Sequence, residues 1–389
     1  MTVRRRFDEG SIRVFNWRNV FRIDPLMSLL IVALAVFGLL VLYSAGRSVS
    51  APVPHYVKQM IFFGMGCGVA VFIACIDYRV LISLAPLAFG VILTLLVLVL
   101  AVGKVVKGAQ SWIDLGPIGF QPSEATKFVL ILFLAWLLTR LGKRVQYFRY
   151  LVLTLGVVAI PTALIFKQPD LGTAAVLLPI GVAMLYAAGC RARQLIAIAI
   201  VGLMGTPFLR ANMKDYQKQR VLTVFNPSAD PRGSGYHTIQ SMITVGSGGV
   251  EGKGYMEGTQ TYLNYLPEHH TDFIFSLLAE EFGFVGGVTA LLLFLTLFWR
   301  ALYIGFAAED LGGTLIVVGV VTLLAFHAFI NISITIGMLP VTGIPLPFFS
   351  YGGAFYLTTM ACTGRVLSVN ARRGSLGYLS RQPALVPVR

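Results

Sequence analysis

Charged residues are scarce in this sequence. They make up 12% of its 389 residues, against 56% hydrophobic residues and a mean hydropathy of +0.77, whereas an ordinary soluble domain has about 25% charged residues. This composition excludes a soluble globular protein. Apolar stretches of roughly 20 residues, the length that crosses a bilayer, recur along almost the whole chain. We therefore expect one integral membrane unit without a separate soluble domain.

Cysteine and nucleotide-binding motifs are also lacking. None of the four cysteines belongs to a spaced pair in a polar loop, which argues against a disulfide framework and a cysteine metal cluster. They are Cys67, Cys75, Cys190 and Cys362. The glycine-rich segment 246–258 contains no GxxxxGKS or GxxxxGKT sequence and is therefore no phosphate-binding P-loop. No small-residue cleavage site marks the first apolar run, which starts near Leu26, so this run is expected to stay as an anchor.

The apolar runs predict an all-α polytopic membrane protein with about ten transmembrane helices. The predicted spans cover residues 26–45, 57–76, 80–102, 125–139, 150–166, 171–188, 194–209, 273–299, 314–338 and 349–369. A long extracytoplasmic loop, 210–271, separates the seventh and eighth spans. We divide the chain into a basic amphipathic N-tail (1–25), a membrane domain (26–370) and a C-tail (371–389).

Basic residues outnumber acidic ones, and the formal net charge is +14. Such a charge suits nucleic-acid binding, but Lys and Arg also gather on the cytoplasmic ends of membrane helices. With the N-terminus inside, 19 of the 31 Lys and Arg residues are cytoplasmic and 6 lie in short outward loops. The other 6 belong to loop 210–271, which is too long to count in this comparison. We therefore expect both termini in the cytoplasm and no nucleic-acid partner.

Unusual polar residues concentrate in the predicted outward segments. The first, 108–127, ends with Glu124 and Lys127 at i and i+3, on one face of the fourth span. A charge pair entering a membrane helix is costly, so a functional pair facing a cavity is one interpretation. The other is a capping arrangement, with Ser123 as N-cap and Glu124 in the first helical turn. The sequence leaves both open.

The second outward segment is the short turn 167–173, KQPDLGT. It places Lys167 and Asp170 between the fifth and sixth spans, which Pro169 separates. Asp170 is expected to be the N-cap of the sixth span. Spacing alone favours this structural role over a functional one.

The third outward segment ends in LPEHHTDFIFSLLAEEFG, which is rich in ionisable groups for a membrane boundary. Asp272 directly precedes the eighth span and is either its N-cap or a functional carboxylate. His269 and His270 are adjacent rather than four residues apart, which argues against a helical zinc site. Glu280 and Glu281 lie about 12 Å further along a helix, inside the bilayer, where they are expected to form a buried polar lock between helices.

The fourth outward segment, 339–353, has three prolines within eight residues and cannot form a regular helix. Irregular backbone at membrane depth is tolerated where it is buried in protein or lines a cavity. We therefore expect this segment to form one wall of a substrate cleft.

Several segments taken together resemble the SEDS family (shape, elongation, division and sporulation) along the whole chain. They are GAQSWIDLG with FQPSE, KQPDLGTA, RVLTVFNPSADPRGSGYHTIQS, GSGGVEGKG, LPEHHTDFIFSLLAEEFG and TGIPLPFFSYGG. The sequences GYHTIQS and GTQT look more like the elongation members than the division members. The resemblance implies a peptidoglycan glycosyltransferase in the cell inner (cytoplasmic) membrane, which polymerises lipid II at the outer face during elongation and cell-shape maintenance.

The roles of individual residues also follow from the resemblance. The aspartate of HTDFIF, here Asp272, is the implied catalytic residue, and Glu124 and Lys127 of QPSExxK are its supporting pair. The other supporting or substrate-binding candidates are Trp112, Gln121, Lys167, Asp170, Gln240, Ser241 and His270. The implied partners are lipid II, the nascent glycan strand, a class B penicillin-binding transpeptidase of the penicillin-binding protein 2 type, and membrane proteins of the elongation complex.

These residues suit the chemistry of glycan polymerisation. A sugar hydroxyl attacks an anomeric carbon while pyrophosphate leaves, so Asp272 serves as general base and Lys127 and Lys167 offset charge on the leaving group. A base acting opposite the leaving group inverts the anomeric centre. The sequence contains no dedicated metal site, and the one cofactor we consider is a divalent cation, Mg²⁺ or Mn²⁺, at the pyrophosphate.

The chain departs from the family where Ser111 and Gly119 replace residues that are often basic in relatives. This lowers positive charge near the pyrophosphate, for which Lys104 and Lys107 are the available substitutes. Three other functions compete with the main interpretation. They are a flippase that moves lipid-linked sugars across the membrane, a division-type polymerase, and a scaffold that only activates a transpeptidase, which the intact motifs oppose.

Overall fold

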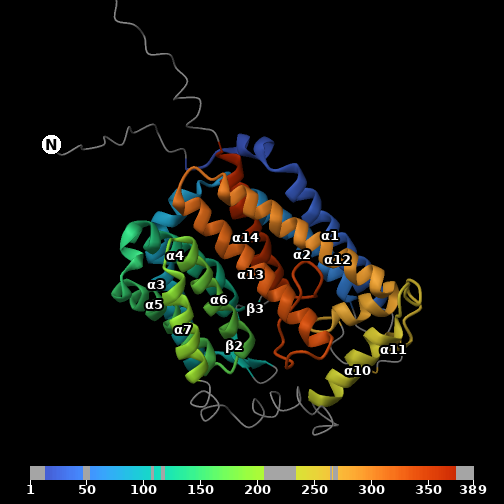
Figure 1. Cartoon of the computed structure of the whole chain (residues 1–389). Coiled ribbons are helices and arrows are strands. Elements are labelled where there is room, and N and C mark those ends of the chain that lie inside the picture. The colour runs from blue at the N-terminus through green and yellow to red at the C-terminus, as the bar shows by residue number, and fades with distance from the viewer. Residues whose placement is uncertain are drawn as a thin grey trace, which may run out of the picture.

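In the computed structural model, every predicted span corresponds to a helix. The described residues are 14–46, 53–106, 109–114, 119–205, 234–262, 265 and 270–373. The helices at the predicted spans are α1 (Pro25–Ala45), α2 (His55–Cys75), α3 (Tyr78–Val102), α4 (Pro122–Leu141), α5 (Phe148–Lys167), α6 (Leu171–Ala187), α7 (Ala192–Met204), α12 (Ile274–Phe306), α13 (Leu311–Thr335) and α14 (Gly353–Ala371). The all-α polytopic fold is thus confirmed (Figure 1).

Seven of these helices are long and apolar enough to cross a membrane: α1 to α5, α12 and α13. Helix α6 is apolar but has 17 residues, and α7 has 13. In α14 the apolar residues alternate with Thr, Ser, Asn and Arg. These three elements are therefore shorter or more polar than an ordinary span.

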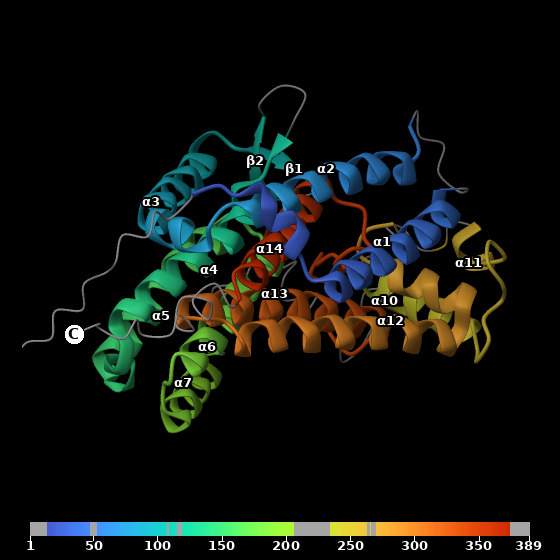
Figure 2. The same cartoon turned by 90° about the horizontal axis from the view of Figure 1, so that it is seen from above.

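Helix α13 occupies the centre of the molecule. It packs against α4, α6, α12 and α14. In its apolar 18-residue stretch, 61% of the residues are buried inside the protein. Figures 1 and 2 show α3 to α7 on one side of α13 and α14, and α1, α10 and α12 on the other. Side chains of α13 therefore reach both halves, which allows residues from distant parts of the sequence to meet along it.

Aspartates begin several of the helices. Asp24, Asp77, Asp170 and Asp310 are the N-cap residues of α1, α3, α6 and α13, and each side chain accepts a hydrogen bond from a backbone amide of the first turn. The predicted capping role of Asp170 is confirmed, with Thr173 N at 3.0 Å from Asp170 Oδ1.

For Ser123 and Asp272, the capping alternative left open by the sequence is not what the structure shows. Helix α4 begins at Pro122, so its N-cap is Gln121 and Ser123 lies inside the first turn. Helix α12 begins at Ile274, and its N-cap is Phe273 rather than Asp272. Proline fits the first helical position, where no amide hydrogen bond is lost, which explains why α4 starts earlier than its apolar run.

A small antiparallel sheet, absent from the sequence prediction, joins α3 to α4. Its order is β1 (Lys104–Val106), β2 (Ala109–Asp114) and β3 (Gly119–Phe120). Strand β2 pairs with both neighbours and holds Ser111 and Trp112 next to the start of α4.

The described part of loop 210–271 contains the short helices α10 (Ser234–Ser247) and α11 (Thr259–Tyr262). Helix α10 packs on α12 and α13. The described residues do not include 206–233, 263, 264 and 266–269, and His269 is among these. Lys107 also lies outside the described residues.

Helix α12 is interrupted at Gly283, whose φ of 62° and ψ of −160° are not helical. The segment before the break therefore has its own direction. At its front, Ser276 Oγ lies 2.7 Å from Ser241 Oγ, which donates to Thr335 O at the end of α13. At its rear, Glu281 accepts a hydrogen bond from Ser44 at the end of α1.

This geometry corrects the predicted depth of Glu280 and Glu281. Because residues 274–282 pass between the ends of two spans, these carboxylates do not lie 12 Å deeper than Asp272. Both are buried. Glu281 joins α12 to α1, as predicted for a polar lock, whereas Glu280 contacts residues of the loop that precedes α12.

Candidate active site

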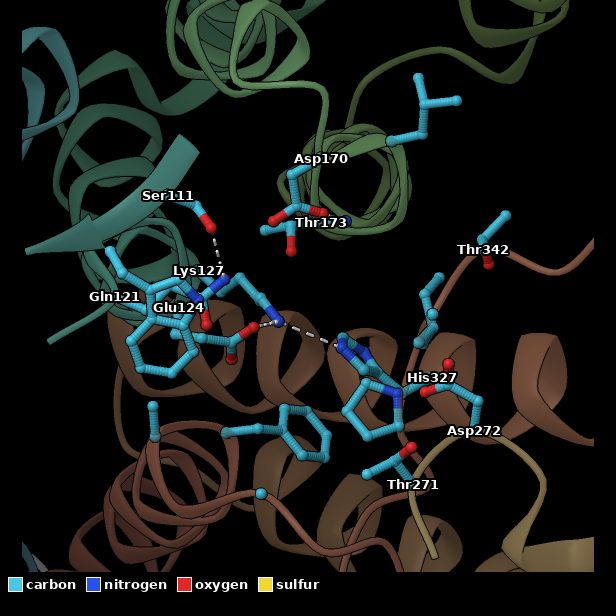
Figure 3. A pocket seen from close by; sticks show the side chains of 18 of the residues that line it. Ser111, Gln121, Glu124, Lys127, Asp170, Thr173, Thr271, Asp272, His327 and Thr342 are labelled. Carbon is cyan, nitrogen blue, oxygen red and sulfur yellow. Dashed lines mark hydrogen bonds and ion pairs between the residues drawn. The ribbon is translucent and has the colours of Figure 1, made fainter. Parts of the chain in front are cut away.

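A cavity of about 400 Å³ lies where α4 and α6 begin and α13 ends. Its lining comes from β2, the start of α4, the turn before α6 and its first turn, residues 271 and 272, His327 in the C-terminal half of α13, and the segment 341–355. Figure 3 shows Glu124 and Lys127 on one side of it, Asp170 and Thr173 on a second, and Thr271 and Asp272 on a third. The volume is within the usual range for a small-molecule site.

Glu124 and Lys127 form the predicted ion pair, with Lys127 Nζ 2.8 Å from Glu124 Oε1. Lys127 is 1% exposed and Glu124 is 6% exposed. Glu124 Oε2 makes no hydrogen bond with the described residues. The attraction within a buried ion pair offsets the cost of desolvating both charges only if further hydrogen bonds are made. The stability of this pair therefore depends on additional hydrogen-bond partners at the cavity.

His327 of α13 supplies the second contact of Lys127. Its Nε2 lies 3.2 Å from Lys127 Nζ, and its Nδ1 lies 2.8 Å from Leu323 O. Because the carbonyl oxygen can only accept, Nδ1 carries the proton and the neutral Nε2 accepts from the ammonium group. The ring stacks on Phe355 with centroids 4.9 Å apart. His327 thereby fixes the ammonium group against the cavity (Figure 3).

Asp272 is held through its backbone. Asn331 Nδ2 donates to Asp272 O at 2.9 Å and to Ile344 O at 2.8 Å, and Ser350 Oγ donates to Thr271 O at 2.6 Å. The carboxylate lines the cavity beside Gly343, where an added Cβ would lie 3.8 Å from Asp272 Oδ2. The side chain is therefore presented to the cavity by neighbours from α13 and from the segment that follows it.

Sequence reasoning missed His327 and Asn331. Both are almost fully buried in an apolar span, four residues apart and hence on one helix face. A polar pair at this spacing inside a membrane helix points to an interior site, and this signal was present in HAFINIS.

The segment 339–353 has the predicted irregular backbone and lines the cavity. Val341, Thr342, Gly343, Ile344 and Pro345 belong to the lining, and none of them is helical. Gly343 has a φ of +72°, a conformation that glycine adopts at low cost. A side chain at this position would meet both backbone strain and the Asp272 carboxylate.

The structure gathers some of the predicted site residues and separates others. Trp112, Gln121 and Asp170 line the cavity together with Glu124, Lys127 and Asp272. Four more do not belong to the lining: Lys167, Gln240, Ser241 and His270. Lys167 is exposed, while Ser241 is buried between Ser276 and Thr335. His270 stacks on His55 at a centroid distance of 4.3 Å.

The departures at positions 111 and 119 leave the β2 side of the cavity without a cation among its lining residues. Gln121 Nε2 donates to the buried Ser111 Oγ at 3.5 Å. Lys104 is exposed and does not line the cavity. Within the described lining, Lys127 alone brings a lysine or arginine charge.

No group of three or more His, Cys, Asp and Glu side chains that could hold a metal ion occurs among the described residues. The carboxylates on the cavity, Glu124, Asp170 and Asp272, come from three separate elements. A divalent ion here would take most of its oxygen ligands from a substrate and water.

The chain is similar to known proteins over most of its length. The family model described as "Cell cycle protein", for FtsW, RodA and SpoVE, matches residues 25–374. Peptidoglycan glycosyltransferase MrdB of Escherichia coli K12 is 38% identical over 361 residues, which cover 92% of this chain and 96% of that protein.

Two solved structures are similar over nearly the same length. A chain of a peptidoglycan synthase complex, described as coordinating polymerization and crosslinking, has 32% identity and a TM-score of 0.77, covering 93% of this chain and 99% of that chain. RodA of Thermus thermophilus has 31% identity and a TM-score of 0.67, covering 93% and 98%. The resemblance seen in the sequence motifs is thus confirmed: the chain belongs to the FtsW, RodA and SpoVE family of SEDS proteins.

Proposed function

We propose that this peptidoglycan glycosyltransferase polymerises lipid II at the outer face of the cytoplasmic membrane, with Asp272 as the general base. Its relatives named MrdB and RodA carry the glycosyltransferase name and favour the elongation type over the division type. One observation carries the catalytic assignment. A single cavity brings the Asp272 carboxylate together with the buried Lys127 cation, although 145 positions separate them (272 − 127).

The proposed step is a displacement at the anomeric carbon. The acceptor sugar hydroxyl gives its proton to Asp272 as its oxygen forms the new glycosidic bond. The bond between the anomeric carbon and the pyrophosphate oxygen breaks, and the electron pair leaves with undecaprenyl pyrophosphate. Attack from the face opposite the leaving group inverts the anomeric centre.

Lys127 is the cation that we assign to the leaving group. An ammonium group has three donors. Two of them are directed at Glu124 Oε1 and His327 Nε2, and we assign the third to a pyrophosphate oxygen. A buried cation fixed before the reaction stabilises developing negative charge more than a mobile one in water. Lys167, the other cation considered from the sequence, is exposed and off the cavity lining.

A divalent cation at the pyrophosphate remains a proposal for the same site. The separated carboxylates support an ion that arrives with the substrate rather than a resident one. Polymerisation is then expected to stop when EDTA is in excess and to return with Mg²⁺ or Mn²⁺. Full activity of the EDTA-treated protein, dialysed into metal-free buffer with metal-free substrate, would contradict it.

We also propose the membrane arrangement and the partner. The chain is an integral membrane protein with several apolar helices, and the distribution of Lys and Arg supports cytoplasmic termini. The synthase complex that it resembles couples polymerization with crosslinking, which supports a class B penicillin-binding transpeptidase as partner.

Labelled lipid II given to the purified protein, alone or fused to its class B partner, tests the function. Wild type is expected to make long glycan strands on a gel, and Asp272→Asn to make none, because an amide of the same shape cannot accept the proton. Glu257→Gln, a matched change of an exposed carboxylate outside the cavity, serves as control. If Asp272→Asn makes as much polymer as wild type, Asp272 is not the general base. Lipid movement in vesicles without polymer from wild type supports the flippase instead.

A further inference from the structure

The loop residues 248–254, which we name the clasp, close the break in α12. An interrupted helix leaves carbonyl groups before the break and amide groups after it without partners. The clasp supplies both kinds of partner through four backbone hydrogen bonds. These are Lys253 N to Glu280 O at 3.0 Å, Gly254 N to Glu281 O at 3.1 Å, Phe284 N to Gly249 O at 3.0 Å and Val285 N to Val250 O at 3.1 Å.

Glycine is required where the clasp and the helix touch. A Cβ added at Gly248 would lie 1.9 Å from Ala279 O, and one at Gly252 would lie 2.1 Å from Glu281 O. Gly252 also has a φ of +85°, which disfavours any side chain. By contrast, a Cβ at Gly246, two residues before the clasp, meets nothing within 4 Å.

An ion pair between the buried Glu280 and the partly exposed Lys253 adds to these backbone contacts. Glu280 is 0% exposed, and its Oε1 accepts from Lys253 Nζ at 2.7 Å and from Gln260 N at 2.9 Å. Removing the Lys253 cation leaves the buried Glu280 carboxylate without a compensating charge, which is unfavourable. The side chain of Lys253 therefore connects the clasp to the segment of α12 before the break.

We propose that the clasp positions Asp272 for the reaction, with Lys253 and Glu280 as positioning residues. This rests on the proposed function, since Asp272 is the group that is positioned. Residues 274–282 form a stiff helical segment about 13 Å long, and Asp272 stands just before its first turn. A tilt of about 10° at Gly283 would move the front of this segment by about 2 Å, and a misplacement of about 1 Å can reduce a rate about 100-fold.

The front of the segment has its own contacts, through Ser276 and through Asn331. The clasp holds the rear, together with the hydrogen bond from Ser44 to Glu281. The front contacts restrain the position of Asp272, and the clasp restrains the tilt at Gly283 that would shift it. Loosening the rear is therefore expected to lower the rate of the chemical step while leaving the cavity able to bind lipid II.

The test compares two pairs of variants in the full chain. Gly252→Ala clashes with the helix, and Gly246→Ala does not. Lys253→Met removes the cation that pairs with the buried Glu280, and Lys253→Arg keeps a cation there. Binding of labelled lipid II gives the affinity and the number of competent molecules, and single-turnover polymerisation gives the rate per bound substrate. Hydrogen exchange of the amides in residues 274–282 measures directly how readily the backbone hydrogen bonds of this segment open.

We expect Gly252→Ala and Lys253→Met to lower the rate per bound substrate at least 10-fold, with affinity and stoichiometry within twofold of wild type and faster exchange in residues 274–282. Gly246→Ala and Lys253→Arg should stay within twofold in every measurement. Wild-type rates in both disrupted variants, or losses matched by fewer competent molecules, overturn the proposal. An active Asp272→Asn variant would instead overturn the general base, so the two failures are distinguishable.

Discussion

His327 shows how a single ring nitrogen can determine the state of a buried cation. His327→Phe keeps the stacking surface against Phe355 but removes the Nε2 acceptor of Lys127. A hydrogen bond to a charged group contributes about 1.5–3 kcal/mol, so we expect polymerisation to fall roughly 10- to 100-fold. His327→Gln, whose amide oxygen can accept in place of Nε2, is expected to recover part of the rate. Equal rates for wild type and His327→Phe would show that Lys127 does not need this contact.

Glu124 and Lys127 have separate tasks in this geometry. The exchanged pair Glu124→Lys with Lys127→Glu preserves opposite charges, yet it places a carboxylate against the neutral acceptor Nε2 of His327 and removes the cation from its buried position. We therefore expect no glycan product from the exchanged pair in the lipid II assay. Wild-type activity would mean that pairing alone matters.

Single residues were predictable from sequence where the cause is local. The i, i+3 spacing brought Glu124 to Lys127, and the residue before an apolar run made Asp170 a cap. The contact between Lys127 and His327 depends on the packing of α4 against α13, 200 residues apart in the chain. The spacing of His327 and Asn331 indicates an interior polar site, but no local pattern specifies that Lys127 is the partner of His327.

At the scale of elements, the lengths of the apolar runs predicted the helices and their order. A segment that crosses lipid must be about 20 apolar residues long and must satisfy its backbone hydrogen bonds within a helix. The break in α12 was not predictable. EEFGFVGG continues an apolar run with glycines, and the positive φ of Gly283 becomes favourable only when the clasp provides hydrogen-bond partners. The strands β1 to β3 were missed for a similar reason, since short strands pair through partners that the pattern of one segment does not specify.

The start of α1 gives a pH-dependent prediction for an element. Burial raises the pKa of Asp24, but hydrogen bonds from Arg300 and from the Met27 amide outweigh this and hold the pKa below its ordinary 3.8. A carboxyl with a lowered folded-state pKa contributes stability above its unfolded pKa and loses it as the pH falls through the folded one. Asp24→Asn, which can still cap the helix, should therefore melt below wild type at pH 6.

The difference between Asp24→Asn and wild type should shrink as the pH falls below about 3.8, where the carboxyl of the unfolded chain becomes protonated, and should be gone below the lower pKa of the folded state. Thermal unfolding in detergent from pH 6 down to pH 3 measures it. Asp170→Asn offers a comparison, because Asp170 caps α6 at 3.0 Å without an ion pair among the described residues. A gap between wild type and Asp24→Asn that is the same at pH 6 and pH 3 would contradict the role of the Arg300 pair.

At the scale of the whole molecule, membrane class and family follow from composition and motifs that run along the chain. The cavity does not, since its walls come from β2, α4, α6, α13 and the segment around Gly343, which meet only when the central α13 is packed on both sides. A division-type role predicts filamentous cells after deletion of the gene. The elongation role predicts cells that round up, and microscopy of the deletion strain distinguishes the two.

The general base is tested most directly by chemical rescue of Asp272→Gly in the lipid II polymerisation assay. This variant removes the carboxylate and leaves room for a small acid. It should make no glycan in plain buffer and regain polymerisation as formate is added, because formate can accept the hydroxyl proton from the vacated position. Polymerisation by Asp272→Gly at the wild-type rate without formate would contradict the account.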